Sequence, residues 1–535
     1  MKKLIALLLA LVMVLSLAAC AGDTTPTEGN DPQPTQGEEP TKAPDPTDPP
    51  APMTNAERYP LDTDTVLRVL FTEDGLGDTD ASRLWTEITG VEIENLTWNN
   101  EQMMTSLAAG DIPDCIVYPW NFPKDKVYEF GAAGKFLDFS QYLDKMPNLS
   151  RMIEEYPEIM DVCTYPDGAM YSLPKIAWSP TGQSNLFYIR MDLLEDMGWD
   201  HVPATTDEFL QFIKEAQAKY GADNSEFVAF MPTNNTYMEW NKVNAISQTL
   251  FPSFGELVEI GLTLDNDGNV VLGAATEQYR HYLEFMHEVW ESGAFEKEIY
   301  TLDAAAGKAA IQNGNCVISI GTSASPNEEN GYEVAVMEPL TSEWQTEKQW
   351  LKRTTITYLG FVANANCEDL DTLLAYCDSF YAPEDDPLNE EGTVWAYSFV
   401  KGIHGVHWTK DDETMTWSAG EPFTQYYEAP SNGVGDFLYA PVTGSLVIKG
   451  NGTLNNLYPY HVLAKNVTNI PLSVDDQDTF SDIWTDMNTY ISQMHGKFIS
   501  GEEDIEAGWA AYMKNLEKMG LEELLEIYQN TIDAK

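Results

Sequence analysis

The chain has 535 residues, of which 43% are hydrophobic, and its formal net charge is −55. This length exceeds that of one ordinary core, so we expect two lobes. The acidic balance leaves no basic surface for a phosphate backbone, which argues against a nucleic-acid partner and favours a role of the charge in solubility.

The first twenty residues have the features of a secretory signal. Lys2 and Lys3 precede an apolar run that ends at Leu17, and two alanines lead to Cys20. The run is shorter than the about 20 apolar residues of a membrane span. The ending "LAAC" resembles the lipobox of bacterial lipoproteins, which implies cleavage before Cys20 and its modification with acyl chains such as palmitate. The alternative is an ordinary signal peptide with a cysteine at its cleavage site.

Residues 21–60 have the composition of a tether. They are rich in Pro, Thr, Asp and Glu, and they contain no aromatic residue before Tyr59. Such a segment cannot bury a core, so we predict that it is disordered and links the membrane to the folded domain.

The folded part opens with alternating strand and helix signals. Apolar runs at 65–71, 91–98 and 115–118 predict strands, and helical patterns lie between them. This order predicts an α/β sheet with helical crossovers. Trp120 and Asn121 come just after the third strand, and ligands of open α/β sheets bind beyond the carboxyl ends of the strands. We therefore expect these two side chains at a ligand site.

The middle of the chain and its tail carry mainly helical patterns. Amphipathic helices are predicted over 205–221, beginning at a threonine cap, and over 276–293, and a buried strand is predicted near 316–321. Apolar residues at 3.6-residue spacing predict three further helices within about 475–535.

Several phrases stand in a characteristic order along residues 62–535. They are "AAGDIPD" (108–114), "DGAMYSLPK" (167–175), "LFYIRMDLLEDMGWDHVPATTDEFLQFIKEAQ" (186–217), "DNDGNVVLGAATEQYRHYLEFMHEVWESGAF" (265–295), "GIHGVHW" (402–408) and "GKFISGEEDIEAGWAAYMKNLEKMGLEELLEIYQ" (496–529). Together they resemble the extracellular solute-binding lipoproteins (family 1 type) of carbohydrate ABC transporters, and in particular the oligosaccharide-binding lipoproteins of Gram-positive bacteria.

The resemblance implies an α/β, two-lobed, periplasmic-binding-protein-like clamshell of type II with discontinuous lobes. Lobe one would hold about 62–170 and a return after about 355, lobe two would hold about 180–350, and the C-terminal helices would follow. The implied function is capture of a sugar or oligosaccharide by a monomer on the outer face of the cell membrane, and its delivery to two ABC permease subunits. No "GxxxxGK[ST]" sequence is present, so ATP hydrolysis would belong to a separate protein.

Sugar recognition requires flat aromatic faces and planar polar groups. Loop aromatics and amides are therefore the preferred ligand residues, and each has packing as its alternative role. For the arginine, which matches one common in the family, the alternative is an ion pair with Asp192. The candidates are Trp120, Asn121, Trp178, Tyr237, Trp240, Tyr358, Trp395 and Arg190.

No cofactor or metal is expected. Alginate-binding relatives carry a calcium loop of the form D-x-N-x-N-G where this chain reads "KYGADNSEFVAF" (219–230), without the alternating oxygen ligands. "DNDGNV" (265–270) fits a turn between two strands better than a calcium loop. His404 and His407 lack an evident third ligand. The five cysteines after Cys20 are scattered through apolar stretches and resemble small buried hydrophobes rather than a disulfide framework.

Other functions remain open at this point. A secreted glycoside hydrolase would need two carboxylates about 5 to 10 Å apart, which 85 acidic residues neither supply nor exclude, and no catalytic phrase argues for one. A binding protein for peptides, polyamines or other cations would use the same acidic balance and aromatic boxes. A sensory lipoprotein would use the same cleft.

Overall fold

The computed structural model describes residues 54–71, 80–117, 122–176, 186–232, 245–256, 258–321, 331–353, 356–382, 406, 408–411, 416–419, 461–464, 467 and 470–534. The chain divides into residues 1–52 and 53–535, and the fold described below belongs to the second part. Within the described ranges, no helix combines the length and apolar character that crossing a membrane would require.

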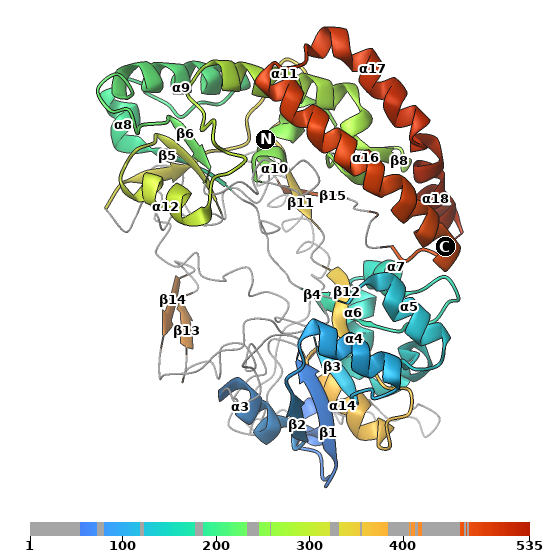
Figure 1. The fold of residues 1–535 in the computed structure, drawn as a ribbon. Coiled ribbons are helices and arrows are strands. Elements are labelled where there is room, and N and C mark those ends of the chain that lie inside the picture. The colour runs from blue at the N-terminus through green and yellow to red at the C-terminus, as the bar shows by residue number, and fades with distance from the viewer. Residues whose placement is uncertain are drawn as a thin grey trace, which may run out of the picture. The chain divides into compact units, whose positions relative to one another are not determined.

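The first sheet has five strands in the order β2-β1-β3-β12-β4 (Figure 1). They are β2 (Glu92–Leu96), β1 (Val66–Phe71), β3 (Cys115–Val117), β12 (Ile356–Ala363) and β4 (Leu173–Ile176). β1 pairs in parallel with β2 and β3, whereas β12 runs antiparallel to β3 and β4. The carboxyl ends of β1, β2, β3 and β4 therefore lie at one edge, together with the amino end of β12.

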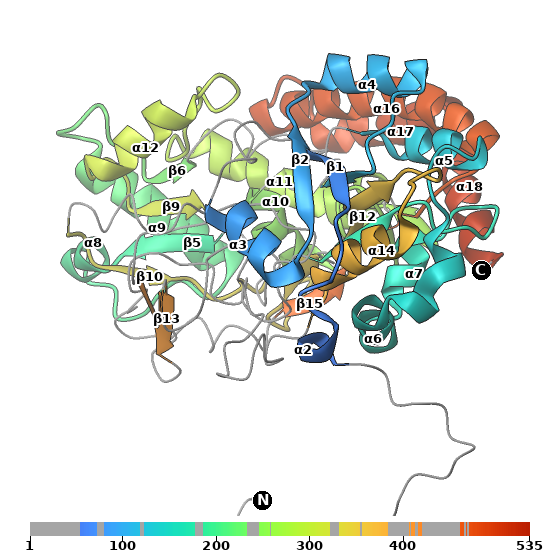
Figure 2. The same cartoon turned by 90° about the horizontal axis from the view of Figure 1, so that it is seen from below.

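Helices cover both faces of this sheet, because side chains alternate between its faces along each strand. Leu67 and Val69 of β1 belong to one core with α14 (Leu370–Ser379), whereas Leu70 belongs to another core with α4 (Asn100–Ala109). Figure 2 shows α4 and α14 beside the strands of this sheet. The first core also contains side chains of α3 (Asp80–Thr89), α6 (Pro147–Glu155) and α7 (Glu158–Cys163), and the second contains side chains of α5 (Lys124–Ala132). The short helices α2 (Asn55–Arg58) and η2 (Phe139–Lys145) complete this lobe. The predicted strand–helix–strand order is confirmed.

Local signals explain why α4 begins and ends where it does. The Asn99 side chain accepts from the backbone N–H of Gln102, and the Gln102 side chain accepts from the backbone of Asn99 in return. Gly110 ends the helix in the left-handed conformation, at φ 88°. The chain then turns directly into β3.

The second sheet has four strands in the order β10-β5-β9-β6. They are β10 (Val334–Val336), β5 (Leu186–Arg190), β9 (Ile318–Gly321) and β6 (Phe230–Pro232). β5 is antiparallel to β9 and β10, and β6 is parallel to β9. The carboxyl ends of β6, β9 and β10 therefore lie at one edge, together with the amino end of β5.

One large core joins this sheet to its own helices and to the C-terminal ones. It includes apolar residues of α8 (Met191–Asp196), α9 (Thr206–Tyr220), α10 (Ala245–Leu250), η4 (Phe251–Phe254) and α11 (Glu277–Glu291), and it continues into α16 (Val474–Ser500), α17 (Ile505–Lys518) and α18 (Leu521–Asp533). α11 packs against α16 and α17, as Figure 1 shows. A threonine cap begins α9 at Thr205, as predicted, and another begins α11 at Thr276.

The remaining elements are small. α12 (Ala304–Gln312) packs against β6, and η5 (Gly273–Ala275) precedes α11. β7 (Leu262–Leu264) and β8 (Val270–Leu272) form a hairpin, and the predicted turn joins them: the Asp265 carboxylate accepts from the backbone N–H groups of Asp267 and Asn269. β11 (Trp350–Arg353) pairs with β15 (His461–Ala464), and β13 (Trp408–Asp411) pairs with β14 (Thr416–Ala419).

Candidate functional site

The connectivity brings the two strand edges described above into one region. The segment 177–185 runs from the carboxyl end of β4 in the first sheet to the amino end of β5 in the second. Ten residue steps separate Ile176 from Leu186, so the two edges lie within about 35 Å of each other at this crossing. An edge of carboxyl ends in each sheet, joined by a short crossing, is the arrangement in which a ligand binds between two lobes.

Most of the predicted ligand residues belong to segments that follow these strand ends. Residues 118–121, with Trp120 and Asn121, follow β3, and Trp178 follows β4. Residues 233–244, with Tyr237 and Trp240, follow β6. These five residues lie outside the described part of the chain, as do Trp395, His404, His407 and Cys20.

Tyr358 is a predicted ligand residue that the structure describes. It lies near the amino end of β12, at the edge of carboxyl ends, and is half-buried. Its hydroxyl donates to the backbone carbonyl of Phe122 at 3.2 Å, and the Lys124 ammonium lies 5.2 Å from its ring centroid. Burial and the nearby Asp125 carboxylate raise the pKa of the Tyr358 hydroxyl to about 12. The hydroxyl is therefore a permanent donor at neutral pH.

Arg190 lies at the other end of its strand. It is the last residue of β5, whose amino end is at the ligand edge. Its guanidinium donates to both carboxylate oxygens of Asp192, at 2.8 and 2.6 Å, and stacks 3.7 Å from the ring centroid of Tyr332. The same guanidinium lowers the pKa of the Asp192 carboxyl. The structure thus gives Arg190 the ion pair that was its alternative role.

Polar side chains of the stretch 219–230 and of the turn before β3 form hydrogen bonds within the protein. Asn224 donates to the side chain of Asn315, which in turn donates to Glu226 at 3.3 Å. Asp114 accepts from the backbone N–H of Arg68 at 2.8 Å and so ties the turn before β3 to β1. Among the residues that the structure describes, no group of three or more His, Cys, Asp or Glu side chains is placed to hold a metal ion.

The described cysteines are free thiols, in agreement with the sequence prediction. Cys115, Cys163, Cys316 and Cys377 are buried, and Cys367 is half-buried. Burial raises the pKa of the Cys316 thiol to about 12, so it remains protonated. These residues act as small apolar side chains.

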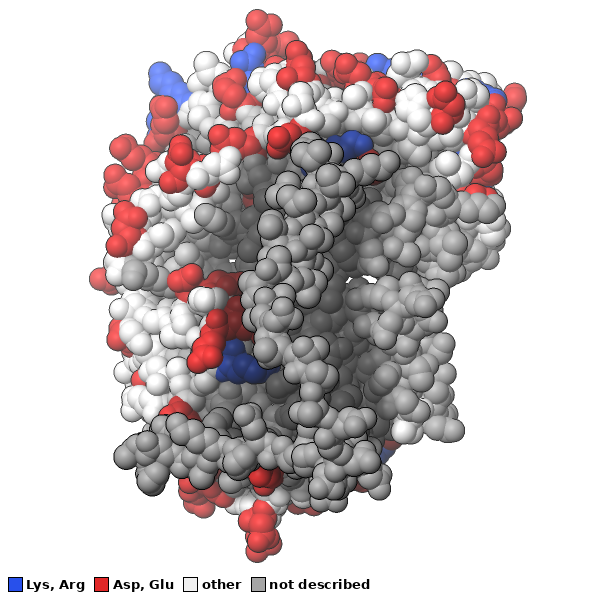
Figure 3. Space-filling model, turned by 180° about the vertical axis from the view of Figure 1, so that it is seen from behind, with Lys and Arg blue, Asp and Glu red and all other residues white. Residues whose placement is uncertain are grey.

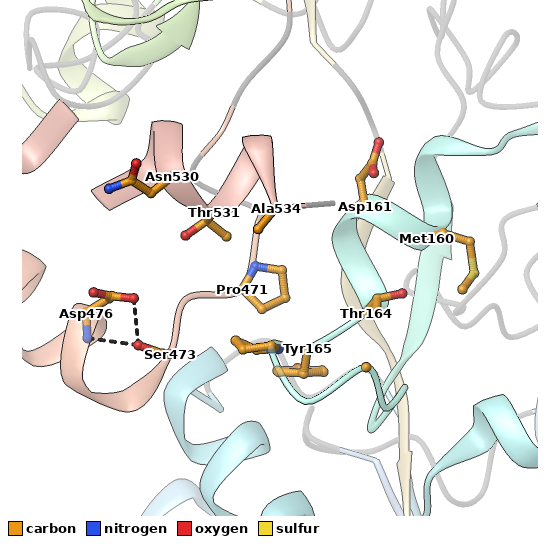
Figure 4. Close-up of a pocket in the computed structure, with 12 residues that line it drawn as sticks. Met160, Asp161, Thr164, Tyr165, Pro471, Ser473, Asp476, Asn530, Thr531 and Ala534 are labelled. Carbon is orange, nitrogen blue, oxygen red and sulfur yellow. Dashed lines mark hydrogen bonds between the residues drawn. The ribbon is translucent and has the colours of Figure 1, made fainter. Parts of the chain in front are cut away.

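A cavity of about 570 Å³ lies between the first lobe and the C-terminal helices (Figure 4). One wall comes from the end of α7 and the turn that leads toward β4. The other comes from the amino end of α16 and the carboxyl end of α18. The lining residues are Met160, Asp161, Thr164, Tyr165, Pro166, Gly168, Pro471, Ser473, Asp476, Asn530, Thr531 and Ala534.

Sequence reasoning did not identify this cavity, because its walls come from segments about 300 residues apart that share no motif. The only local signal is the cap of α16, where the Ser473 hydroxyl donates to Asp476 at 2.6 Å (Figure 4). The lining contains carboxylates and hydroxyls but no Lys, Arg or His. The cavity lining and the set of predicted ligand residues have no residue in common.

The described surface is strongly acidic. Figure 3 shows carboxylate side chains spread across the face it draws, with few basic ones between them. On the described part of this face the carboxylates are dispersed, which fits the predicted role of the charge in solubility.

Comparison with known protein families and curated proteins gives clear matches. The family described as bacterial extracellular solute-binding protein matches residues 67–385, more than half of the chain. The fructooligosaccharide ABC transporter substrate-binding protein FusA of Streptococcus pneumoniae is 24% identical over 494 residues, which cover 83% of this chain and 85% of FusA. Lipoprotein LipO of Bacillus subtilis is 24% identical over 284 residues, 50% of this chain and 52% of LipO.

Solved structures share the fold at low sequence identity. FusA of S. pneumoniae in complex with kestose superposes with a TM-score of 0.65 at 21% identity, covering 88% of this chain and 99% of that chain. An HMO-binding, ABC-transporter-associated solute-binding protein of Bifidobacterium longum infantis gives a TM-score of 0.66 at 18% identity, covering 88% and 98%. The fold is therefore the two-lobed α/β fold of type II solute-binding proteins.

Proposed function

The chain belongs to the family of bacterial extracellular solute-binding proteins, and from this premise we propose that it captures a sugar or oligosaccharide between its lobes for an ABC transporter. One observation carries the proposal. Each sheet gathers the carboxyl ends of its strands at one edge, and the crossing 177–185 joins the two edges. The fructooligosaccharide named for FusA supports a carbohydrate as the ligand class.

The proposed ligand contacts are the residues that follow these strand ends. Trp120 and Asn121 would act from the first lobe, Tyr237 and Trp240 from the second, and Trp178 from the crossing. Trp395 is kept as a further contact. Aromatic faces stack on the apolar side of a sugar ring, and planar polar groups pair with neighbouring hydroxyls. Arg190 is left out of this set because its guanidinium is committed to Asp192 and Tyr332.

The protein is proposed to bind its ligand without transforming it. Its partners would be two permease subunits and a separate ATPase, and ligand would stabilise the closed arrangement of the lobes. The family consists of solute-binding proteins rather than enzymes. We further propose that the protein is a monomer.

We propose that acyl chains on Cys20 anchor the protein to the outer face of the cell membrane, with residues 21–60 as its tether. The similarity to the lipoprotein LipO supports this. The substitution Cys20→Ala should release the protein into the medium. Its retention on the membrane would overturn the proposed anchor.

The proposed sugar binding is tested by thermal unfolding of the chain from residue 20 onward, with Cys20 replaced by alanine. The melting temperature is measured with each member of a panel of neutral and acidic oligosaccharides. A ligand present at a hundred times its dissociation constant stabilises the folded state by about 2.7 kcal/mol. We expect a raised melting temperature with one glycan class. A shift with peptides or polyamines but with no glycan would refute the proposal, as would release of reducing ends from a polysaccharide.

A further inference from the structure

Tyr358 links two parts of the first lobe that are far apart in the chain. Its hydroxyl donates to the carbonyl of Phe122, 236 residues away in the sequence. Phe122 is the first described residue after the segment 118–121, which carries the proposed ligand residues Trp120 and Asn121. The bond therefore holds the backbone carbonyl of Phe122, the residue that follows that segment in the sequence.

The pairing register between β12 and β4 is irregular at Tyr358. Ile356 and Thr357 pair with Ile176 and Lys175 of β4, but the next pair joins Phe361 to Leu173. Between these two pairs, β12 has three residues (358–360) and β4 has one (Pro174), so β12 forms a bulge there. Bulges re-aim side chains, and they are frequent beside functional sites. Without the bulge, Tyr358 would sit in regular register with β4.

The other side of the Phe122 contact is held by packing. The Phe122 side chain is fully buried, with its ring centroid 5.9 Å from that of Phe130 and 5.8 Å from that of Phe136. The ring anchors the residue to the core, and the Tyr358 hydroxyl sets the direction of its carbonyl. Lys124, two residues later, places its ammonium near the same tyrosine ring.

We propose that Tyr358 is a positioning residue of the ligand edge, which acts through the Phe122 carbonyl rather than by stacking on the sugar. The hydroxyl is already committed as a donor, and the Lys124 ammonium lies near the ring. The inference rests on the proposed function, because the segment that it positions carries two of the proposed ligand contacts. It differs from the role expected for Tyr358 from the sequence, that of a direct contact.

The test compares Tyr358→Phe with Tyr512→Phe. The Tyr512 hydroxyl also donates to a backbone carbonyl, that of Ala274 at 2.9 Å, but it lies in the core of the second lobe. Both substitutions keep the ring and remove one hydrogen bond to a backbone carbonyl. Tyr512 is the more buried of the two residues, so its substitution should cost at least as much stability. Amide hydrogen exchange of the ligand-free protein measures the positioning. Titration calorimetry measures the affinity, with the oligosaccharide of the panel described above that raises the melting temperature.

We expect Tyr358→Phe to speed amide exchange at residues 118–125 and to weaken glycan binding by about two- to tenfold, the range for one hydrogen bond. Tyr512→Phe should change neither quantity. Unchanged exchange in Tyr358→Phe, or equal loss of affinity in both variants, would overturn the positioning role. If the unsubstituted protein binds no glycan, the proposed function fails, and the exchange experiment still decides the role of Tyr358.

Discussion

His495 should make the protein lose stability in mild acid, because its imidazole is buried without a charged partner. The residue lies on α16 and faces α11, where the Tyr279 hydroxyl is 2.8 Å from Nδ1 and the rings of Tyr279 and Tyr282 stack beside it. Its side chain is 2% exposed, and Nε2 has no hydrogen-bond partner among the described residues. Burial lowers the pKa of His495 from 6.5 to about 4.

The sign follows from proton binding in the two states. Below pH 6.5 the unfolded chain takes up a proton at His495, whereas the folded protein does so only near pH 4. Stability from this residue is therefore complete above pH 6.5 and falls as the pH drops toward 4. The full loss is about 3 kcal/mol, of which about 2 kcal/mol falls between pH 7 and pH 5.

Urea unfolding at pH 7 and pH 5, followed by helical circular dichroism, measures this loss in the unsubstituted protein and in His495→Gln. Glutamine keeps a polar group near Tyr279 but does not titrate, so the variant should lose about 2 kcal/mol less between the two pH values. His201→Gln is the control. His201 is exposed beside Asp200 and Glu208, and its pKa is raised, so removing it should not reduce the acid loss. An equal acid loss in His495→Gln and in the unsubstituted protein would refute the reasoning.

Three further outcomes are expected. Gly360→Ala should lower the free energy of unfolding by about 2 kcal/mol or more, because the alanine Cβ would lie 2.2 Å from the Pro174 carbonyl oxygen. An unfolding free energy equal to that of the unsubstituted protein would contradict this contact. Arg58→Met should cost about 3 kcal/mol, because it removes the charged partner, at 2.6 Å, of the fully buried Asp378 carboxylate and leaves it only the backbone N–H groups of Asn148 and Leu149 among the described residues. Arg58→Met combined with Asp378→Asn should recover part of this loss. Trp120→Ala should weaken glycan binding about tenfold by calorimetry with little change in melting temperature, and unchanged affinity would remove this residue from the site.

The opening of the fold could be predicted because its signals are local. The cap at Asn99, the left-handed Gly110 and the apolar run at 115–117 act within a few residues of one another, and the helix and strand form where these signals place them. The C-terminal helices could be predicted for the same reason. Their place in the core of the second lobe could not, since that depends on which distant faces their apolar stripes meet.

The sequence predicts the kind of site, and its contact residues remain predictions. Strand ends followed by Trp, Tyr and Asn point to a ligand edge, and the sheet directions support that edge. Arg190 shows the limit of the approach. Its position at the end of an apolar strand is compatible with a ligand contact, and only the structure shows the two bonds to Asp192 and the stacked Tyr332 ring.

The bulge in β12 shows why the remaining details need a structure. "ITYLGFVA" reads as one regular buried strand, and its only irregular letter is Gly360. Whether that glycine marks a weak strand or a close approach depends on Pro174, which lies far away in the chain. The close approach requires a residue without a Cβ, and it lies in the stretch where the register shifts. Tyr358, which donates to the Phe122 carbonyl, belongs to the same stretch. Gly360, the shifted register and the bond from Tyr358 thus occur together in β12, around a contact with Pro174 that no pattern within the strand encodes.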